Sequence, residues 1–378
     1  AGDLISPSLL SGFDKGAHTI ALTNLAPPDI FTPGNHEYDF GPEVFFQRMK
    51  EAKFPLYAAN LRKADGKPLD GFKDRSIVDL GGVKVGLVGL TAEDSPVKSS
   101  PGADLKFLPT VETTVAEAKA LREAGADLVV AVVHANRQVD RALYDSRAVD
   151  IILTGDDHDL ALFFDGRTVM VESKEEAEFV TAVDVTVDVE EKDGKRSVTW
   201  YPNFRIIDTA TVAPDPETQA LVDKYNAELS KELDIPVGIT SESLDSRKAT
   251  VRTTEAAIGN LVADASREAV GADVAITNGG GIRGNKEYAP GTEITRRDIL
   301  TELPFGNRTV KIEVTGETIW AALENGVSQV ENSAGRFPQV SGLSFEAELT
   351  KPAGERVTAV MIGGAPIDTA KIYTIATN

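Results

Sequence analysis

The run LVVAVV, residues 128–133, contains no polar side chain. A strand with this sequence has no face suited to water, so it belongs in a sheet that is covered on both sides. It follows residues 111–123, whose apolar positions have helical spacing and end at Gly125. A helix leading into a buried strand is the repeating unit of parallel sheets, and residues 141–155 repeat it. These features predict an α/β fold.

The bulk composition limits the classes of function. The 378 residues carry a formal charge of −20 and include no cysteine. Nucleic-acid polymers and anionic membranes repel such a chain, so neither is an expected partner. Disulfides, thiolate zinc sites and cysteine nucleophiles are excluded. No apolar run approaches the roughly 20 residues of a transmembrane helix.

The length of the chain and the order of its patterns predict two domains. Residues 75–91 predict a hairpin with its turn at Gly81-Gly82, and residues 179–207 predict a longer one with a Lys-Asp-Gly turn. Residues 215–234 have the pattern of one amphipathic helix flanked by proline, as expected of a connector. We therefore expect a first domain, a connector and a second domain at 1–208, 209–236 and 237–378.

Three of the four histidines lie where an expected strand gives way to a loop. His36 stands in GNHEYDFG with Asp39 close enough to pair with it, His134 follows the LVVAVV strand, and His158 lies in DDHD after the next strand. The carboxyl ends of strands are where α/β folds place their sites. Each feature alone also fits a polar turn, a core histidine or a solvated acidic turn. His18, in a helix-like segment, is expected to be structural.

Together, imidazole and oxygen donors without thiolate suit Zn²⁺, Mn²⁺ or a similar ion in a hydrolytic site. The motifs that contain them resemble the 5'-nucleotidase family of two-domain metallophosphoesterases. The resemblance covers essentially the whole chain and is carried by GNHEYDFG, VVHANR, GDDHD, GNLVADA, NGGGIRG and LPFGN. It implies an N-terminal four-layer α/β/β/α metallophosphoesterase sandwich and a C-terminal α/β 5'-nucleotidase substrate-binding domain.

The resemblance implies a centre of two divalent ions, Zn²⁺, Mn²⁺ or Mg²⁺, with a catalytic dyad formed by His36 and Asp39. The implied metal ligands are Asp3, Asn35, His134, Asp156 and His158. Asp3 would bridge the ions, and Asp156 stands where the family has a histidine. We hypothesise that this carboxylate makes the site favour harder ions such as Mn²⁺ or Mg²⁺ over Zn²⁺.

In the second domain the resemblance implies contacts with a nucleotide. Arg252 and Arg283 would hold it, since guanidinium groups suit phosphate oxygens. Asn278 and Asn307 would contact the base, and Phe305 would stack on it. The structural alternatives are surface ion pairs for the arginines and core packing for the phenylalanine. The three glycines after Asn278 indicate a close backbone approach or a positive φ.

Two elements of the family are absent from the sequence. An Asp-x-His element expected before Asp3 would supply ligands of the first ion. A Phe-containing segment expected after residue 378 would supply a second stacking ring. We expect the chain to begin within its first domain, with an incomplete first metal site as the alternative.

The resulting hypothesis is metal-dependent hydrolysis of nucleoside phosphates by a periplasmic or extracellular enzyme whose partner is a small-molecule nucleotide. One alternative keeps the metal centre but changes the substrate to a cyclic nucleotide, a dinucleotide, a sugar nucleotide or a sulfur ester. Another is a nucleotide-binding protein with a decayed metal site. The sequence does not indicate an oligomeric state.

Overall fold

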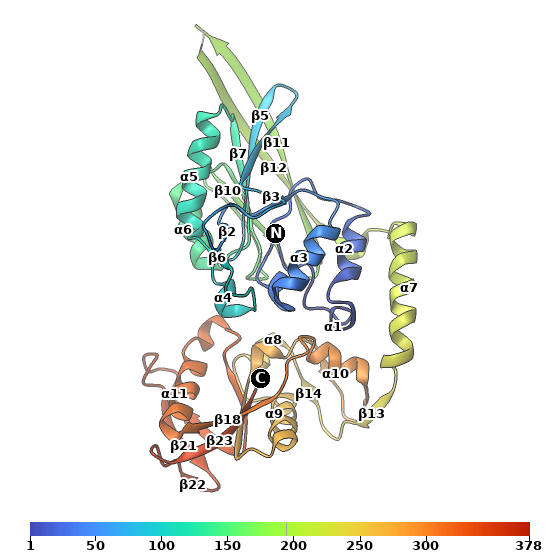
Figure 1. The fold of residues 1–378 in the computed structure, drawn as a ribbon, viewed down its shortest axis with the longest axis vertical. Helices are drawn as coiled ribbons and strands as arrows, with labels where there is room; N and C mark the ends of the chain where they lie inside the picture. The colour runs from blue at the N-terminus through green and yellow to red at the C-terminus, as the bar shows by residue number, and fades with distance from the viewer. Residues whose placement is uncertain (194) are drawn as a thin grey trace. The chain divides into compact units, whose positions relative to one another are not determined.

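The computed structural model describes residues 1–193 and 195–378, without the side chains of residues 195, 229, 231 and 232. Its contacts divide the chain into two compact units, Ala1–Asn226 and Ala227–Asn378 (Figure 1). The division falls within helix α7 (Pro216–Leu233), which confirms the predicted amphipathic helix. Both units mix helices and strands, so the predicted α/β class is confirmed.

The first unit is built on a six-stranded sheet in the order β4-β5-β7-β8-β10-β9. The strand bounds are β4 Arg75–Leu80, β5 Val83–Leu90, β7 Leu128–Val133, β8 Ile151–Leu153, β9 Leu160–Phe164 and β10 Val169–Ser173. Strands β5, β7, β8 and β10 run parallel, and β4 and β9 pair antiparallel at the edges. The predicted hairpin of residues 75–91 is therefore confirmed, and both glycines of its turn have positive φ.

Strand β7 is covered on both faces, as its sequence requires. The covering elements are α5 Thr110–Glu123, α6 Arg137–Ser146, β11 Phe179–Lys192 and β12 Lys195–Asp208. Successive side chains of a strand point to opposite faces. Val129 shares a core with α5 and α6, whereas Val130 packs in the core that includes the β11–β12 hairpin. Figure 1 shows both helices along one flank of the sheet. The turn predicted for this hairpin includes residue 194, which lies outside the described residues.

A second core in this unit surrounds the N-terminal segment and includes Ile5, Phe31, Tyr38 and Phe45. The shorter elements of the unit are α1 Ser11–Asp14, α2 Ala17–Thr23, η1 His36–Tyr38, α3 Gly41–Glu51, β1 Leu56–Tyr57, β2 Leu61–Lys63, β3 Phe72–Lys73, α4 Ser95–Lys98, β6 Leu105–Phe107 and η2 Thr209–Thr211. This core holds the GNHE turn against the sheet-forming part of the unit.

The second unit has a four-stranded sheet in the order β18-β23-β15-β19. Val274 and Ala275, neighbours in β15, belong to different cores, one containing residues of α11 and the other containing Ala263 of α9. The two helices therefore cover opposite faces of the sheet. The helices of the unit are α8 Lys248–Val251, α9 Ala257–Val270, η3 Gly279–Gly281, α10 Arg296–Glu302, α11 Gly316–Val327 and η4 Val330–Asn332.

The strands of the second unit are β13 Pro236–Ile239, β14 Leu244–Asp245, β15 Val274–Asn278, β16 Glu287–Tyr288, β17 Glu293–Thr295, β18 Val310–Thr315, β19 Pro338–Ser341, β20 Leu343–Ala347, β21 Val357–Ile362, β22 Ala365–Pro366 and β23 Ile372–Thr377. In the described part of the chain, every helix is too short or too polar to cross a bilayer.

Candidate functional site

Three strand exits of the first unit converge at one edge of its sheet, because β5, β7 and β8 are adjacent and parallel. His134 directly follows β7, Asp156 lies in the loop after β8, and Lys98 ends helix α4 after β5. The His134 N–H donates to Leu90 O at 2.9 Å, and the N–H of the next residue donates to Gly155 O at 3.3 Å. Such an edge is where α/β folds place their sites.

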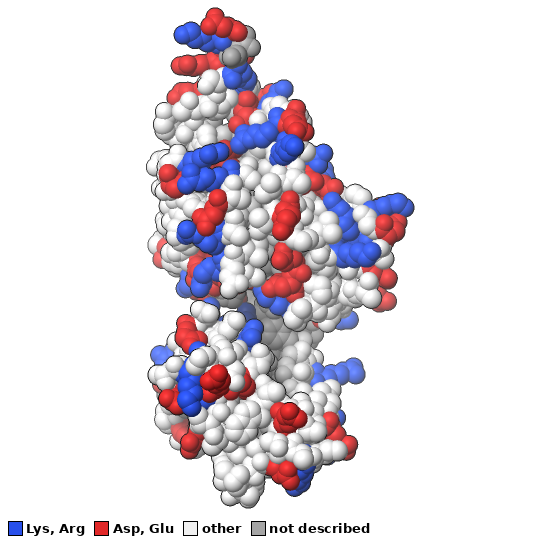
Figure 2. All heavy atoms as spheres, turned by 90° about the vertical axis from the view of Figure 1, so that its left-hand side faces the viewer, with Lys and Arg blue, Asp and Glu red and all other residues white. Residues whose placement is uncertain are grey.

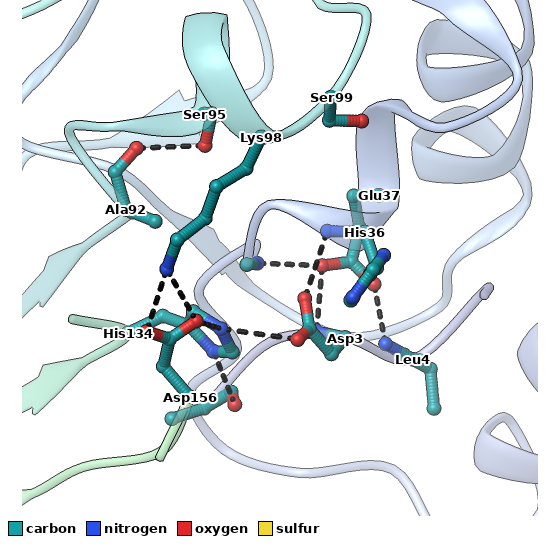
Figure 3. A network of polar contacts seen from close by, with 12 residues as sticks. Asp3, Leu4, His36, Glu37, Ala92, Ser95, Lys98, Ser99, His134 and Asp156 are labelled. Carbon is teal, nitrogen blue, oxygen red and sulfur yellow. Dashed lines mark hydrogen bonds and ion pairs between the residues drawn. The ribbon is translucent and has the colours of Figure 1, made fainter. Parts of the chain in front are cut away.

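Asp3, His134 and Asp156 form a cluster of potential metal ligands at this edge. One ligand atom from each residue lies within 4.8 Å of those from the other two. His134 Nε2 is 3.2 Å from Asp3 Oδ2 and 3.4 Å from Asp156 Oδ1 (Figure 3). His134 is 2% exposed, so the two carboxylates face the imidazole away from bulk water.

The two ring nitrogens of His134 have different surroundings. Nδ1 lies 3.0 Å from the carbonyl oxygen of Ala1, which can only accept, so Nδ1 carries a proton. Nε2 is buried and makes no hydrogen bond among the described residues. Burial lowers the pKa of His134, but the carboxylates of Asp3 and Asp156 outweigh burial and raise the pKa well above its usual value. A positive charge at Nε2 is therefore stabilised by both carboxylates.

Asn35 lies between Gly34 and His36, which both approach the Asp3 carboxylate. Its side chain is 3% exposed, and its Oδ1 makes no hydrogen bond within the described part of the chain. A buried polar atom without a partner is unfavourable. A divalent cation can accept carboxylate, amide and imidazole ligands at the same time. The donors therefore fit an ion of the kind that the sequence led us to expect.

Glu37 fixes the position of Asp3, a role that the sequence analysis did not assign. Its carboxylate is fully buried and accepts N–H bonds of 2.5–3.1 Å from Asp3, Leu4, Ile5 and Gly34. Burial and the charge of Asp3 raise the pKa of Glu37, whereas the backbone donors favour its ionised form. The carboxylate thus joins the N-terminal segment to the GNHE turn.

The backbone around the cluster is strained. Asp3, Asp156 and His158 have φ values of 56°, 107° and 65°, a region that non-glycine residues seldom adopt. A Cβ on Gly34 would lie 2.2 Å from Asp3 Oδ1, so only glycine allows this approach. Strained residues of this kind cluster at functional sites, which supports a functional role for the edge.

His36 and Asp39 form a hydrogen-bonded pair beside the cluster. His36 Nδ1 lies 2.7 Å from Asp39 Oδ2. The hydroxyls of Ser6 and Ser99 donate to Asp39 at 2.7 Å each. The His36 backbone N–H donates to Asp3 Oδ1 at 2.8 Å and so ties the pair to the cluster.

His158 shares a loop with Asp156 but is not a member of the three-residue cluster. Its side chain is partly buried. The loop is anchored to α6 through Thr154, whose hydroxyl lies 2.8 and 2.7 Å from the two carboxyl oxygens of Asp140. Burial raises the pKa of Asp140 to about 8 even though the hydrogen bond from Thr154 lowers it.

His18 lies outside this site, in keeping with the structural role expected for it. Nδ1 is 2.9 Å from Asp14 Oδ1, and Nε2 is 3.2 Å from Ser8 Oγ. The Ser8 hydroxyl accepts the N–H of Ser11 at 3.1 Å, and the ring of Tyr225 packs edge-on against His18. This Ser-His-Asp array stabilises the start of helix α1.

In the second unit, the structure brings Asn278 and Arg252 to Gly335. Asn278 Nδ2 and the Gly280 N–H both donate to the carbonyl oxygen of Gly335, at 3.2 and 2.8 Å. A Cβ on Gly335 would lie 4.0 Å from Arg252 Cζ. The segment around Gly335 therefore lies beside two residues expected to contact a nucleotide, although no motif in the sequence pointed to it.

The glycine turn after Asn278 packs closely on other backbone. A Cβ on Gly279 would lie 2.0 Å from the carbonyl oxygen of Val251, and one on Gly280 would lie 2.8 Å from Gly335 Cα. None of the three turn glycines has positive φ. Of the two reasons expected for this turn, the close backbone approach is confirmed.

The structure also brings Arg283 and Phe305 together. The guanidinium carbon lies 5.6 Å from the ring centroid, within the range of cation–π interactions. Asn307 is exposed two residues beyond Phe305. The Arg283 N–H donates to Glu302 O at 2.8 Å, so the two motifs NGGGIRG and LPFGN are joined through backbone.

Glu302 is a second buried carboxylate that the sequence analysis missed. It is 4% exposed and accepts hydrogen bonds from Ser246 Oγ, Tyr288 Oη and the Gly284 N–H at 2.8–3.0 Å. Its place directly before LPFGN is the only signal in the sequence, because nothing in the residue type distinguishes it from a surface glutamate. Glu302 holds the loop that carries Arg283.

The chain is similar to known proteins along its whole length. Residues 236–378 match the family described as 5'-nucleotidase, C-terminal domain. The chain is 31% identical to the trifunctional nucleotide phosphoesterase protein YfkN of Bacillus subtilis (strain 168), over all of this chain and 29% of that protein. It is 26% identical to the protein UshA of Escherichia coli (strain K12), over 94% of this chain and 71% of UshA.

A solved structure resembles the whole chain. It is the 5'-nucleotidase precursor from Thermus thermophilus, with a TM-score of 0.86 and 28% identity over all of this chain and 78% of that one. The fold is that of a two-unit protein similar to solved 5'-nucleotidases. Residues 236–378 belong to the 5'-nucleotidase C-terminal domain family, and the resemblance of the chain to the 5'-nucleotidase family is confirmed. The chain spans less than a third of the length of the Bacillus relative.

We predict that Glu37→Gln destabilises the first unit by on the order of 3 kcal/mol and abolishes metal binding. The glutamine amide would direct N–H groups at backbone donors, leaving buried donors unpaired. Chemical denaturation and calorimetric Mn²⁺ titration measure the two effects. Glu43→Gln, at an exposed position of α3, is the matched control and should change neither. An E37Q protein with wild-type stability would contradict the role of Glu37.

We predict that Mn²⁺ binding releases about one proton at neutral pH, because the ion replaces the proton on His134 Nε2. The raised pKa of His134 gives the sign: the two carboxylates favour the protonated imidazole, so metal affinity falls as the pH is lowered. Calorimetry in buffers of different ionisation enthalpy counts the released protons. Binding without proton exchange would contradict the assignment of Nε2 as a ligand.

Proposed function

We propose that the chain hydrolyses the phosphate ester of nucleoside phosphates in a metal-dependent reaction. The observation that carries the proposal is a set of buried, incompletely bonded donors beside a hydrogen-bonded His-Asp pair. The donors are His134 Nε2 and Asn35 Oδ1, with the Asp3 and Asp156 carboxylates facing His134.

Two divalent ions complete the proposed centre. Asp3, Asn35, His134 and Asp156 would hold one, and Asp3 and His158 would contribute to the other. Such ions supply Lewis-acid polarisation of the phosphoryl group and neutralise charge that develops on it. The chain's own contribution is to hold the donors rigidly, which the strained backbone and the Glu37 hydrogen bonds support.

His36 acts on the leaving group in this proposal. Its Nδ1 proton is held by Asp39, which orients the ring and stabilises the imidazolium form. His36 Nε2 then donates a proton to the nucleoside oxygen as the ester bond breaks. The hydroxyls of Ser6 and Ser99 keep the Asp39 carboxylate in place for this task.

We propose that residues 1–208 form the catalytic domain, 209–236 the connector and 237–378 the nucleotide-binding domain. The nucleotide contacts are Arg252, Asn278, Arg283, Phe305 and Asn307. The contact between Arg283 and Phe305 supports this assignment, because it presents a flat, partly charged surface on which a base can stack.

On the face drawn in Figure 2, basic side chains are interspersed with acidic ones, which suits a small ligand better than a nucleic-acid polymer. A periplasmic or extracellular location is part of this proposal.

A second candidate is a nucleotide-binding protein with a decayed metal site. One observation favours it: the ammonium group of Lys98 already bonds both oxygens of Asp156. Metal binding by the protein separates the two candidates, because only the hydrolase requires the ion.

We expect the full-length protein to release phosphate from at least one nucleoside phosphate in the presence of Mn²⁺, Mg²⁺ or Zn²⁺. His36→Asn should lower kcat by about 10²–10⁴-fold with little change in KM, because it removes the proton donor but no metal ligand. Asp39→Asn should act in the same direction. A colorimetric phosphate assay over a nucleotide panel measures these effects. No release with any nucleotide or metal would overturn the proposal.

We expect Asp156→His to shift the metal preference from Mn²⁺ or Mg²⁺ toward Zn²⁺, because it exchanges a hard oxygen donor for an imidazole. Calorimetric titrations of wild type and variant with each ion give the ratio of dissociation constants. An unchanged ratio would show that Asp156 does not select the ion.

A further inference from the structure

Lys98 brings an ammonium group to the cluster, where it reaches from helix α4 to Asp156 (Figure 3). Its Nζ donates to both carboxylate oxygens of Asp156, at 3.0 and 2.8 Å, and lies 3.2 Å from Asp94 Oδ2. The Asp156 side chain is only 10% exposed, so solvent screens this ion pair less than an ordinary surface pair.

The same carboxylate faces the proposed metal site. Asp156 Oδ1 lies 3.4 Å from His134 Nε2, and both residues belong to the group that could hold an ion. One carboxylate is thus shared between an ammonium group and the metal cluster. Two cations that use one carboxylate repel each other and compete for its charge.

The fold fixes Lys98 in this position. Helix α4 directly follows the exit of β5, and the Ser95 N–H and hydroxyl both bond to Ala92 O, at 3.2 and 2.7 Å. The next residue after Lys98, Ser99, donates to Asp39 of the proposed dyad at 2.7 Å. Helix α4 therefore places the ammonium group at the site, and the residue that follows the helix contacts the proposed catalytic pair.

We propose that Lys98 sets the affinity of the metal centre: it neutralises Asp156 and thereby weakens the binding of the divalent ion. This inference rests on the proposed metal centre and deepens it. The pair of Asp156 and Lys98 is electrically neutral, so the ion meets one full negative charge fewer than the cluster of carboxylates suggests. The contact between the Lys98 ammonium group and Asp156 is thus compatible with a metal centre that still binds its ion.

The test is calorimetric titration of Mn²⁺ into the full-length protein, with the metal-induced shift in unfolding temperature as a second readout. Lys98→Met should lower the dissociation constant by about tenfold or more, because it releases the full charge of Asp156 to the ion. Lys98→Arg, which keeps the charge, should stay close to wild type. Lys63→Met is the matched control, since it removes a lysine paired with Asp70 elsewhere in the same unit, and it should leave the affinity unchanged.

A double-mutant cycle sharpens the assignment. Asp156→His alone leaves the ammonium group beside a neutral ligand and should weaken Mn²⁺ binding, and adding Lys98→Met should recover part of the loss. If Lys98→Met folds normally by circular dichroism but binds Mn²⁺ as wild type does, or more weakly, the proposal is wrong. Lys98→Gln provides a second neutral variant if the methionine protein does not fold.

These outcomes are separable from those of the proposed function. Phosphate release without an effect of Lys98→Met on affinity overturns the role of Lys98 and leaves the hydrolase. Tighter Mn²⁺ binding by Lys98→Met without phosphate release from any nucleotide supports the role of Lys98 and overturns the hydrolase. A wild-type protein that binds none of Mn²⁺, Mg²⁺ and Zn²⁺ overturns both.

Discussion

The site depends first on the carboxylate of Glu37 and the backbone N–H groups that surround it. Asp3 adopts a left-handed backbone conformation that its residue type disfavours, and its carboxylate lies against Gly34 at a distance that admits no side chain. The left-handed backbone of Asp3 and this close approach both cost free energy unless other contacts compensate for them. Hydrogen bonds from Asp3, Leu4, Ile5 and Gly34 to one buried carboxyl group offset the strain. The position of the first predicted metal ligand is therefore set by a residue that is not itself a ligand.

The strand order of the sheet positions the remaining residues of the site. Adjacent parallel strands must end at the same edge, so the exits of β5, β7 and β8 deliver Lys98, His134 and Asp156 to one place. The chain as a whole is strongly acidic and would repel an anionic ligand. In the proposed function, the cations of the metal centre supply the local positive charge that such a ligand needs. In the proposed centre, the carboxylates bind the cation and Lys98 limits how strongly they do so.

Features with a local cause could be predicted from the sequence. The LVVAVV strand, the glycine hairpin and the amphipathic helix follow from periodicity and turn residues within a few positions. The close approach at the NGGG turn was expected because only glycine permits it.

Glu37, Glu302 and Lys98 could not be found in this way, because their partners lie far away in the sequence. Glu37 bonds the backbone of Asp3, 34 residues away, and Lys98 bonds a residue 58 positions away. GDDHD was interpreted as one ligand loop, but Asp156 alone of its residues lies in the cluster with Asp3 and His134.

The interlock of Gly280 with Gly335 limits how this protein can diverge. A side chain on either residue would meet the backbone of the other, at 2.8 and 3.1 Å. A substitution at one position is therefore accommodated only if the distant segment moves as well, and that segment lies beside Arg252. The two segments, remote in the sequence, are therefore structurally coupled beside Arg252 of the proposed nucleotide site.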